Sequence, residues 1–212
     1  MARIAQLIVL TFVTSLPALS SLGQEPVVDP TCGLEVQRQP IRVSPLYRQL
    51  RPNRILIVRS LDREDRLKEQ QVLVERLANH LRRESLFDIV ECKDCICDAS
   101  NPIRTALFDE RKLLHYANTY GVDSVLYCTV QSIDAYRPMN VELQFVLISI
   151  DQSVAVASGT LSFDLADPIT EQIFINTFNY GDLFATAAQS SPSRLIDFAA
   201  AHLAAELKSL WR

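Results

Sequence analysis

Cysteines are the residues of this sequence with the widest chemistry, because a thiolate can form a disulfide, bind a metal or act in redox reactions. The five are Cys32, Cys92, Cys95, Cys97 and Cys128. Cys128 lies inside a β-rich stretch, which predicts a buried free thiol that packs as a small apolar residue. The other four are predicted in loops or at strand ends. Thiols in such places pair in an oxidising compartment, so we predict disulfide bonds.

Four cysteines allow three pairings. A bridge between Cys95 and Cys97 would be too tight for ordinary disulfide geometry. The sequence therefore favours Cys32–Cys97 with Cys92–Cys95, or Cys32–Cys95 with Cys92–Cys97. Either arrangement would attach the N-terminal segment to the end of a strand near residue 90. In the chain-entropy description, closing such a loop stabilises the fold by roughly 3–4 kcal/mol.

Two other chemistries compete for the same cluster. Cys92, Cys95 and Cys97 could bind a soft metal, with Cys32 or a histidine as a further ligand. No second Cys-x-x-Cys motif or histidine pair completes that site. Cys92 and Cys95 could instead form a redox-active pair, but they follow a strand rather than open a helix, where such thiols are activated. Disulfides remain the favoured prediction.

Other residues that could act in catalysis have simpler interpretations. The three histidines, His80, His115 and His202, lie at the borders of predicted helical apolar stripes. Asp62, Glu64 and Asp65 follow the first buried strand, and Asp94 and Asp98 could extend them into an acidic rim. Acidic residues are common at a helix N-terminus, where they complement its dipole. The sequence holds no nucleophile-elbow, zinc-protease or phosphate-loop motif. We therefore expect a non-catalytic protein without a cofactor.

One predicted hairpin loop offers a contact surface instead. Tyr136, Arg137 and Met139 lie between two predicted strands. Tyrosine, arginine and methionine are enriched where proteins bind one another. We therefore predict that these three side chains are exposed and form a protein-contact surface.

The N-terminus predicts export. Arg3 gives a cationic start, Ile4 to Val13 is an apolar run too short to cross a bilayer, and small residues follow Pro17. This order is typical of a cleavable signal peptide over residues 1–23. No later segment reaches about 18 uninterrupted apolar residues, so the mature chain is expected to lack a transmembrane segment. We predict a periplasmic or secreted protein.

Composition restricts the partners. The full chain carries a formal net charge of −4, and a mildly acidic domain lacks the field that attracts nucleic acid or anionic lipid.

Residues 24–52 contain five prolines and little periodicity, which indicates an extended lead-in. Residues 53–212 are expected to form a single α/β domain.

Periodicity within that domain predicts the order β-α-β-α-β-β-β-α. The expected strands cover residues 55–58, 87–90, 124–133, 141–150 and 154–165, and the expected helices 67–83, 105–120 and 191–210. Gly121 should close the second helix in a left-handed cap. Parallel crossovers followed by an antiparallel meander give a mixed sheet with helices packed on it.

That order of elements, together with several short sequence segments, resembles a small bacterial envelope domain. The family includes the curli secretion channel subunit, the amino-terminal domain of TolB and penicillin-binding-protein activator lipoproteins. The matching segments are Asn53–Val58, Leu86–Glu91, Tyr120–Leu126 and Val146–Asp151. Members of this group bind partners and organise envelope assemblies without shared catalytic residues. The resemblance implies an exported assembly protein that binds another envelope protein or its own copies. The alternative is a secreted thiol or metal-binding protein that uses Cys92, Cys95 and Cys97.

Overall fold

The fold is seen in a computed structural model of the whole chain, which describes residues 40–60, 66–83, 87–97, 102–105, 108–178 and 191–211. For residues 60, 93–97, 104 and 105 it describes the backbone alone. The predicted signal peptide, most of the lead-in, and Cys32, Asp62, Glu64, Asp65 and Asp98 lie outside the described residues.

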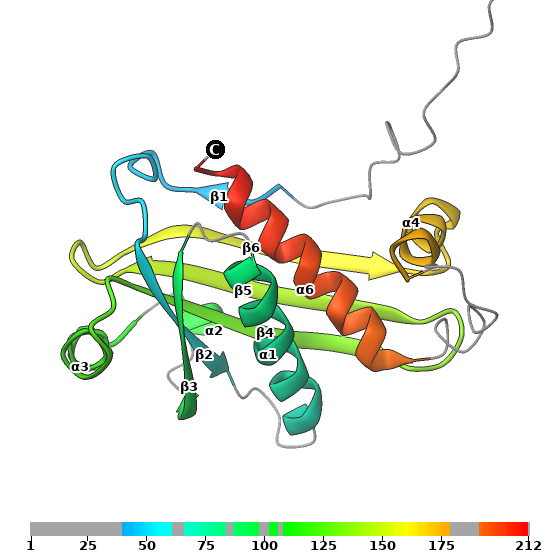
Figure 1. Cartoon of the computed structure of the whole chain (residues 1–212), viewed down its shortest axis with the longest axis horizontal. Helices are drawn as coiled ribbons and strands as arrows, with labels where there is room; N and C mark the ends of the chain where they lie inside the picture. The colour runs from blue at the N-terminus through cyan, green and yellow to red at the C-terminus, as the bar shows by residue number, and fades with distance from the viewer. Residues whose placement is uncertain are drawn as a thin grey trace, which may run out of the picture. The chain divides into compact units, whose positions relative to one another are not determined.

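The centre of the fold is one mixed sheet of six strands in the order β1-β6-β5-β4-β2-β3 (Figure 1). Its strands are β1 (Arg42–Val43), β2 (Arg54–Ser60), β3 (Asp88–Cys97), β4 (Ser124–Asp134), β5 (Asn140–Ser149) and β6 (Val154–Asp164). β2 pairs in parallel with β3 and β4, whereas β4, β5, β6 and β1 pair antiparallel. The predicted α/β class, crossovers and meander are therefore confirmed.

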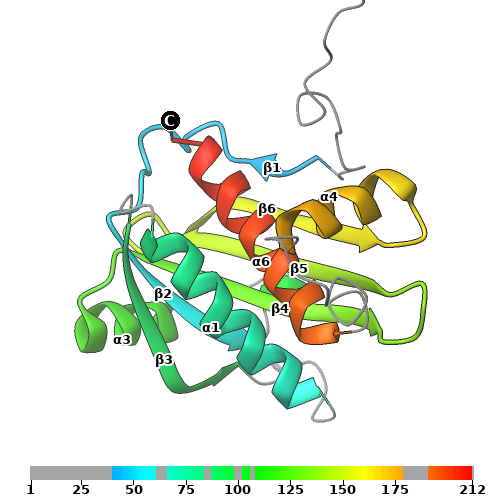
Figure 2. The ribbon, with the colours of Figure 1, turned by 45° about the vertical axis from the view of Figure 1, so that its right-hand side comes forward.

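Two long helices cover the first face of this sheet. They are α1 (Leu67–Arg83) and α6 (Pro192–Ser209), which lie side by side in both ribbon views (Figures 1 and 2). The apolar stripe of α1 is buried from Leu73 to Leu81, whereas Leu67 at the start of the helix is 44% exposed. The apolar residues of α6 pack against β5 and β6. The short helix α4 (Pro168–Phe178) joins them through ring contacts of Phe174 with Phe198. This face holds the larger hydrophobic core.

The second face is covered only in part. α3 (Glu110–Tyr120) packs over β2 and β4, and α2 (Pro102–Thr105) contacts β4 and β5. Leu113 and Tyr116 of α3 pack there against Val125 and Tyr127 of β4 in a second, smaller core. Helices α4 and α6 contact β6, but they lie on the first face. Among the described helices, α2 therefore reaches β5 on the second face, whereas none packs extensively on β6 there.

Local capping explains where several elements begin and end. Gly121 has φ 63° and ψ 35° and closes α3 as predicted, with its N–H donating to Ala117. The N-cap carboxylate of Asp109 accepts a hydrogen bond from the N–H of Arg111, so α3 starts at Glu110. The expected helix over residues 105–120 was therefore wrong at its start. α6 begins at Pro192 as predicted.

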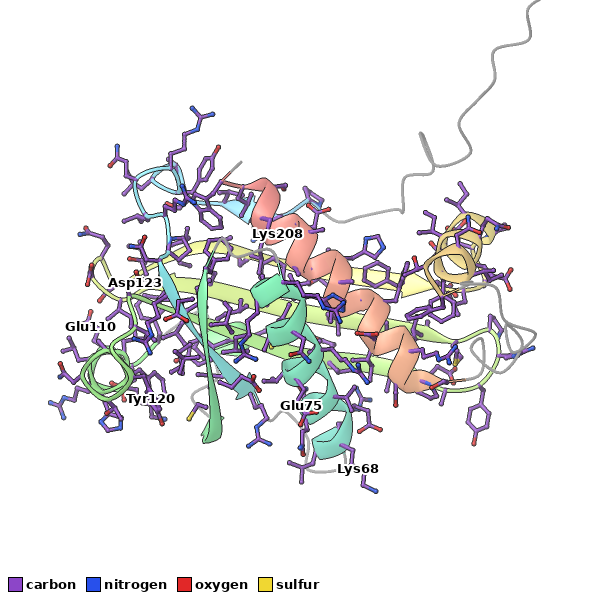
Figure 3. The ribbon with its side chains drawn as sticks, in the orientation of Figure 1. Lys68, Glu75, Glu110, Tyr120, Asp123 and Lys208 are labelled. Carbon is purple, nitrogen blue, oxygen red and sulfur yellow. The ribbon has the colours of Figure 1, made fainter. Side chains whose placement is uncertain are left out.

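Carboxylates fix two further junctions. Asp167 precedes α4, and hydrogen bonds from the hydroxyl and backbone N–H of Thr170 hold the pKa of its carboxyl below the ordinary value. Asp123, labelled in Figure 3, accepts from the N–H of Asn53 at 2.9 Å. This bond ties the start of β2 to the turn between α3 and β4. Because the bonded groups are far apart in sequence, it is a tertiary contact.

Several sequence expectations need correction. β3 continues as a strand to Cys97, although residues 91–97 were expected to leave the sheet, because Arg59 and Ser60 of β2 resume the parallel ladder with Ile96 and Cys97 after a register shift. The expected lead-in adds β1 at the sheet edge. Leu114 was expected to face inward but is 58% exposed. None of the helices in the described ranges is both long and apolar enough to cross a membrane.

Candidate interaction surface

Over β5 and β6, side chains on the second sheet face remain partly exposed in the described part of the chain. Along β6, Leu161 and Phe163 are buried beneath the helices, whereas Thr160, Ser162 and Asp164 alternate with them and remain partly or fully exposed. β5 follows the same alternation. Its outward side chains are Asn140, Glu142, Gln144 and Val146, which oppose Asp164, Ser162, Thr160 and Ser158 of β6. We call these eight side chains of β5 and β6 the open face.

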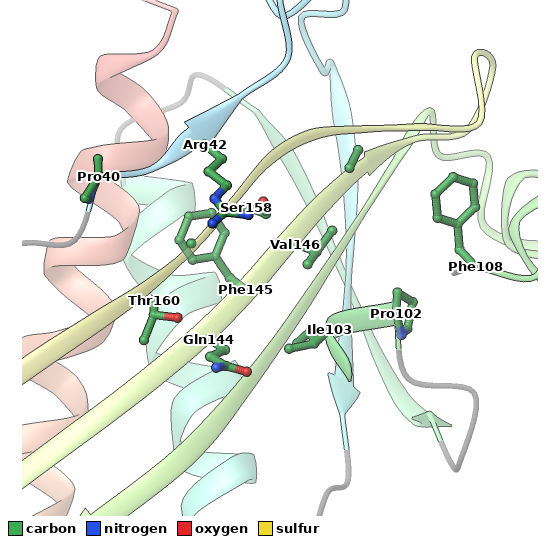
Figure 4. Close-up of a pocket in the computed structure, with 12 residues that line it drawn as sticks. Pro40, Arg42, Pro102, Ile103, Phe108, Gln144, Phe145, Val146, Ser158 and Thr160 are labelled. Atoms are coloured by element: carbon green, nitrogen blue, oxygen red, sulfur yellow. The ribbon is translucent and has the colours of Figure 1, made fainter. Parts of the chain in front are cut away.

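A pocket of about 390 Å³ opens at one end of the open face (Figure 4). Its floor is formed by β5 and β6, one wall by the chain at β1, and the opposite wall by α2 and Phe108. The lining consists of Pro40, Arg42, Pro102, Ile103, Phe108, Gln144, Phe145, Val146, Ala155, Ser158, Gly159 and Thr160. The site therefore collects side chains from four separate parts of the chain.

Arg42 is the one charged residue among the described residues that line this pocket. It is held there because β1 pairs antiparallel with β6 and sets Arg42 opposite Ser158. Figure 4 shows its side chain extending from β1 toward Ser158. Within the described ranges no acidic side chain lies within ion-pair distance of its guanidinium. Arg42 therefore presents an uncompensated positive charge at the rim.

Neutral hydrogen-bonding groups lie beside that charge. The side chains of Gln144, Ser158 and Thr160 have no hydrogen-bond partner in the described part of the chain. An amide offers both donors and an acceptor, and each hydroxyl offers one donor and two acceptor lone pairs. These groups can therefore satisfy the polar atoms of a ligand. Opposite them, Pro102, Ile103 and Phe108 supply an apolar wall.

Close packing keeps β1 against the sheet at this point. A Cβ placed on Gly159 would lie 3.2 Å from a ring carbon of Phe145 and 3.5 Å from Ile41. The missing side chain therefore lets Ile41 and Phe145 approach the same strand position. The bond from the N–H of Ser44 to the carbonyl of Val156, at 2.9 Å, continues the attachment. These contacts position Arg42.

The predicted contact surface at the β4–β5 hairpin is only partly as expected. Tyr136 is 84% exposed and Arg137 is exposed, as predicted. Met139 is 1% exposed, so its predicted role in an exposed contact surface was wrong. It immediately precedes Asn140, the first residue of β5, and its side chain turns into the main core. Beside it, Arg137, Met139, Leu165 and Glu171 line a smaller hollow of about 250 Å³.

The cysteines are divided between the two faces. Cys92 is buried in the smaller core, where its sulfur lies 3.1 Å from the hydroxyl oxygen of Tyr120. The side chains of Cys95 and Cys97 lie outside the described set, so both pairings and the metal alternative stay predictions. Cys128 is a free thiol with no exposed surface, as expected. Burial raises the pKa of Cys128 to about 12, because a thiolate would lose its hydration there.

The histidines form no common site in the structure. His80 lies between α1 and α6 with its Nε2 2.9 Å from a carboxylate oxygen of Asp197. His202 packs against the rings of Phe163 and Phe198. His115 is exposed on α3. No group of three or more His, Cys, Asp or Glu side chains within the described ranges could hold a metal ion.

Sequence reasoning missed the pocket around Arg42. Arg42 belongs to a segment with no periodic pattern, and no local signal places it beside β6. The polar alternation of β5 and β6 was visible, since Glu142 and Gln144 interrupt the apolar residues of β5. That signal indicates a strand with one solvated face. It does not reveal which helices leave the face open.

These features define a class: a helix-covered mixed α/β sheet with one partly open face and a pocket at its rim. No family in the family scan matches the chain. No curated protein matches it in sequence either.

Solved structures with a similar arrangement include a PelC dodecamer from Paraburkholderia phytofirmans, at 14% identity and a TM-score of 0.38, covering 74% of this chain and 94% of that one. Lipoprotein GNA1162 from Neisseria meningitidis matches at 16% identity and a TM-score of 0.38, over 62% and 100% of the two chains. The hypothetical protein CT253 from Chlamydia trachomatis matches at 10% identity and a TM-score of 0.47, over 74% and 99%. The fold assignment itself rests on the strand pairing of this chain.

Proposed function

We propose that this chain is an exported, non-catalytic interaction protein of the bacterial cell envelope that binds its partner through the open face. The observation that carries the proposal is the unequal covering of the sheet. Two long helices bury the first face, whereas on the second face the smaller core covers β2, β4 and one end of β5, and most of the open face stays partly exposed among the described residues. Half-solvated faces are common in antiparallel sheets. Here the open face also contains a pocket whose cation, Arg42, has no acidic partner among the described residues, and a partner protein can fill it.

Export is supported by two separate features. The order of charge, apolar run and small residues at the N-terminus is typical of a signal peptide. The sequence also predicts disulfide bonds among its cysteines, and such bonds persist mainly outside the cytosol. The partner class follows from location and charge: a protein component of the envelope or a second copy of the chain, rather than nucleic acid.

Site-specific photo-crosslinking in the native host tests the proposed surface. A photoreactive amino acid at Thr160 lies on the open face, and one at Asn79 lies on the exposed side of α1 and serves as the matched control. We expect discrete adducts from position 160 and none from position 79 in fractionated, exported protein. Equal labelling from both positions, or none from either, would contradict the proposal.

A thiol or metal function is the competing hypothesis, and mass spectrometry separates it from this one. Intact mass after alkylation without reductant should show two bridges and one free thiol per chain. A metal-binding protein would instead show unpaired cysteines among Cys92, Cys95 and Cys97, and elemental analysis would find a metal in stoichiometric amount. That result would overturn the non-catalytic assignment.

A further inference from the structure

We propose that the pocket at Arg42 binds a carboxylate of a partner polypeptide, with an apolar side chain of the same polypeptide against Phe108. This inference rests on the proposed function, because it names the chemistry by which the partner is recognised. The occupant is one chemical group, and a chain terminus or an acidic side chain can supply it.

The charge of the pocket selects an anion. Arg42 is exposed, and the described part of the chain provides no acid to pair with it. The acidic side chains of the open face, Glu142 and Asp164, are paired with Ser162 and Asn140 in the ladder, further along the strands from the pocket. A guanidinium presents parallel N–H groups that match the two oxygens of a carboxylate. The positive end of the open face is therefore suited to a single carboxylate.

The neutral groups complete the polar half of the site. Ser158 lies directly opposite Arg42 in the β1–β6 ladder, and Thr160 lies opposite Gln144 in the β5–β6 ladder. Their hydroxyl and amide groups have no partners within the described residues, so they are free to bond the second carboxylate oxygen and a neighbouring peptide group. A polypeptide supplies both kinds of group next to each other.

The apolar wall argues for a side chain rather than a second charge. Pro102 and Phe108 line the pocket opposite Arg42 (Figure 4). Phosphate sites use several basic side chains or a helix N-terminus, and the described lining provides only one cation. The volume of about 390 Å³ falls in the range that binds small ligands. A carboxylate together with one aliphatic or aromatic side chain suits this combination.

Titration of the exported protein with short peptides, followed by ¹H–¹⁵N chemical shifts, tests the proposal. The three probes are acetyl-Thr-Leu-Phe with a free carboxyl terminus, the same peptide as its amide, and acetyl-Glu-Leu-Phe amide. We expect saturable shifts from the first or third probe, or both, and none from the second. The first and third probes distinguish the two sources of the carboxylate.

Variants of the rim provide the decisive comparison. Arg42→Gln should weaken binding by about fivefold or more, because a hydrogen bond to a charged group is lost. Arg111→Gln removes an exposed arginine on α3, outside the lining, and should leave binding unchanged. Ser158→Asp places a carboxylate opposite Arg42 within the protein and should also block the peptides. Unchanged thermal unfolding shows that each variant is folded.

Three results would overturn the inference. Arg42→Gln could bind as tightly as the parent, the amide probe could bind as well as the acids, or glucuronic acid could bind while the peptides do not. Crosslinking from position 160 to a partner, together with no peptide binding, would leave the proposed function standing and remove this inference alone.

Discussion

Replacing Cys128 by alanine should remove one pH-dependent contribution to the free energy of unfolding. The thiol is fully buried, and loss of hydration raises its pKa to about 12 from an ordinary value of about 9. Because the folded state holds the proton more tightly, the contribution is complete below pH 9 and declines as the pH rises toward 12. One pH unit above the unfolded pKa corresponds to about 1.4 kcal/mol. At pH 10, the free energy of unfolding of the parent should therefore be about 1.4 kcal/mol lower than at pH 7 because of this one thiol.

Urea unfolding of the parent and of Cys128→Ala at pH 7, 8.5 and 10 measures this contribution of the thiol to stability. The difference between the two proteins isolates it, because all other titrating groups are shared. We expect the stability advantage of the parent over the variant to shrink by about 1.4 kcal/mol between pH 7 and 10. Cys128→Val, which also lacks a titrating group, should follow the alanine variant. Reversibility is checked at each pH, since an unfolded thiolate can attack disulfides. A constant difference across this range would refute the assigned burial and pKa.

Four further outcomes follow from individual contacts. A thiol reagent at pH 8 should find no reactive thiol in the folded protein and one per chain in urea without reductant, because Cys128 is buried and free; label in the folded protein would contradict this. Asp197→Ala should cost about 1 kcal/mol of unfolding free energy and be non-additive with His80→Ala, since the two side chains are 2.9 Å apart. Trp211→Phe should lower the free energy of unfolding by about 1 kcal/mol, because it removes the hydrogen bond from the indole N–H to the Tyr47 carbonyl. An unchanged free energy of unfolding would show that this bond is not formed in solution. Gly121→Ala should cost about 1 kcal/mol because φ is 63° there, and urea unfolding that showed no change would exclude the left-handed cap.

The elements that sequence predicted best are those whose information is local. The helix over Leu67–Arg83 was predicted at its observed bounds, because its apolar residues recur on one side of a 3.6-residue period. Gly121 marked the end of α3, since glycine adopts a left-handed conformation without steric cost. The hairpin turn around Ser153 was likewise visible from its polar residues.

The errors arose where a neighbour in space decides the outcome. Met139 was expected at the surface because it follows Arg137 in a polar loop, but its side chain packs in the core beneath the hairpin. The strand through Cys97 depends on pairing with Arg59 and Ser60 of β2, which no local pattern in that segment indicates. Apolar residues and cysteines near an element boundary are ambiguous until the partner strand is known.

The sequence alone determined the helix-covered mixed sheet, the buried thiol of Cys128 and the expectation of export, because each depends on periodicity, composition or order along the chain. Only the tertiary structure decided that Arg42, Phe108, Gln144 and Ser158 share one pocket. Strand pairing places β1 beside β6, and the described helices of the second face, α2 and α3, do not extend over β6. Both features depend on contacts between segments that are distant in sequence, and the local pattern of one segment does not predict which other segment it contacts.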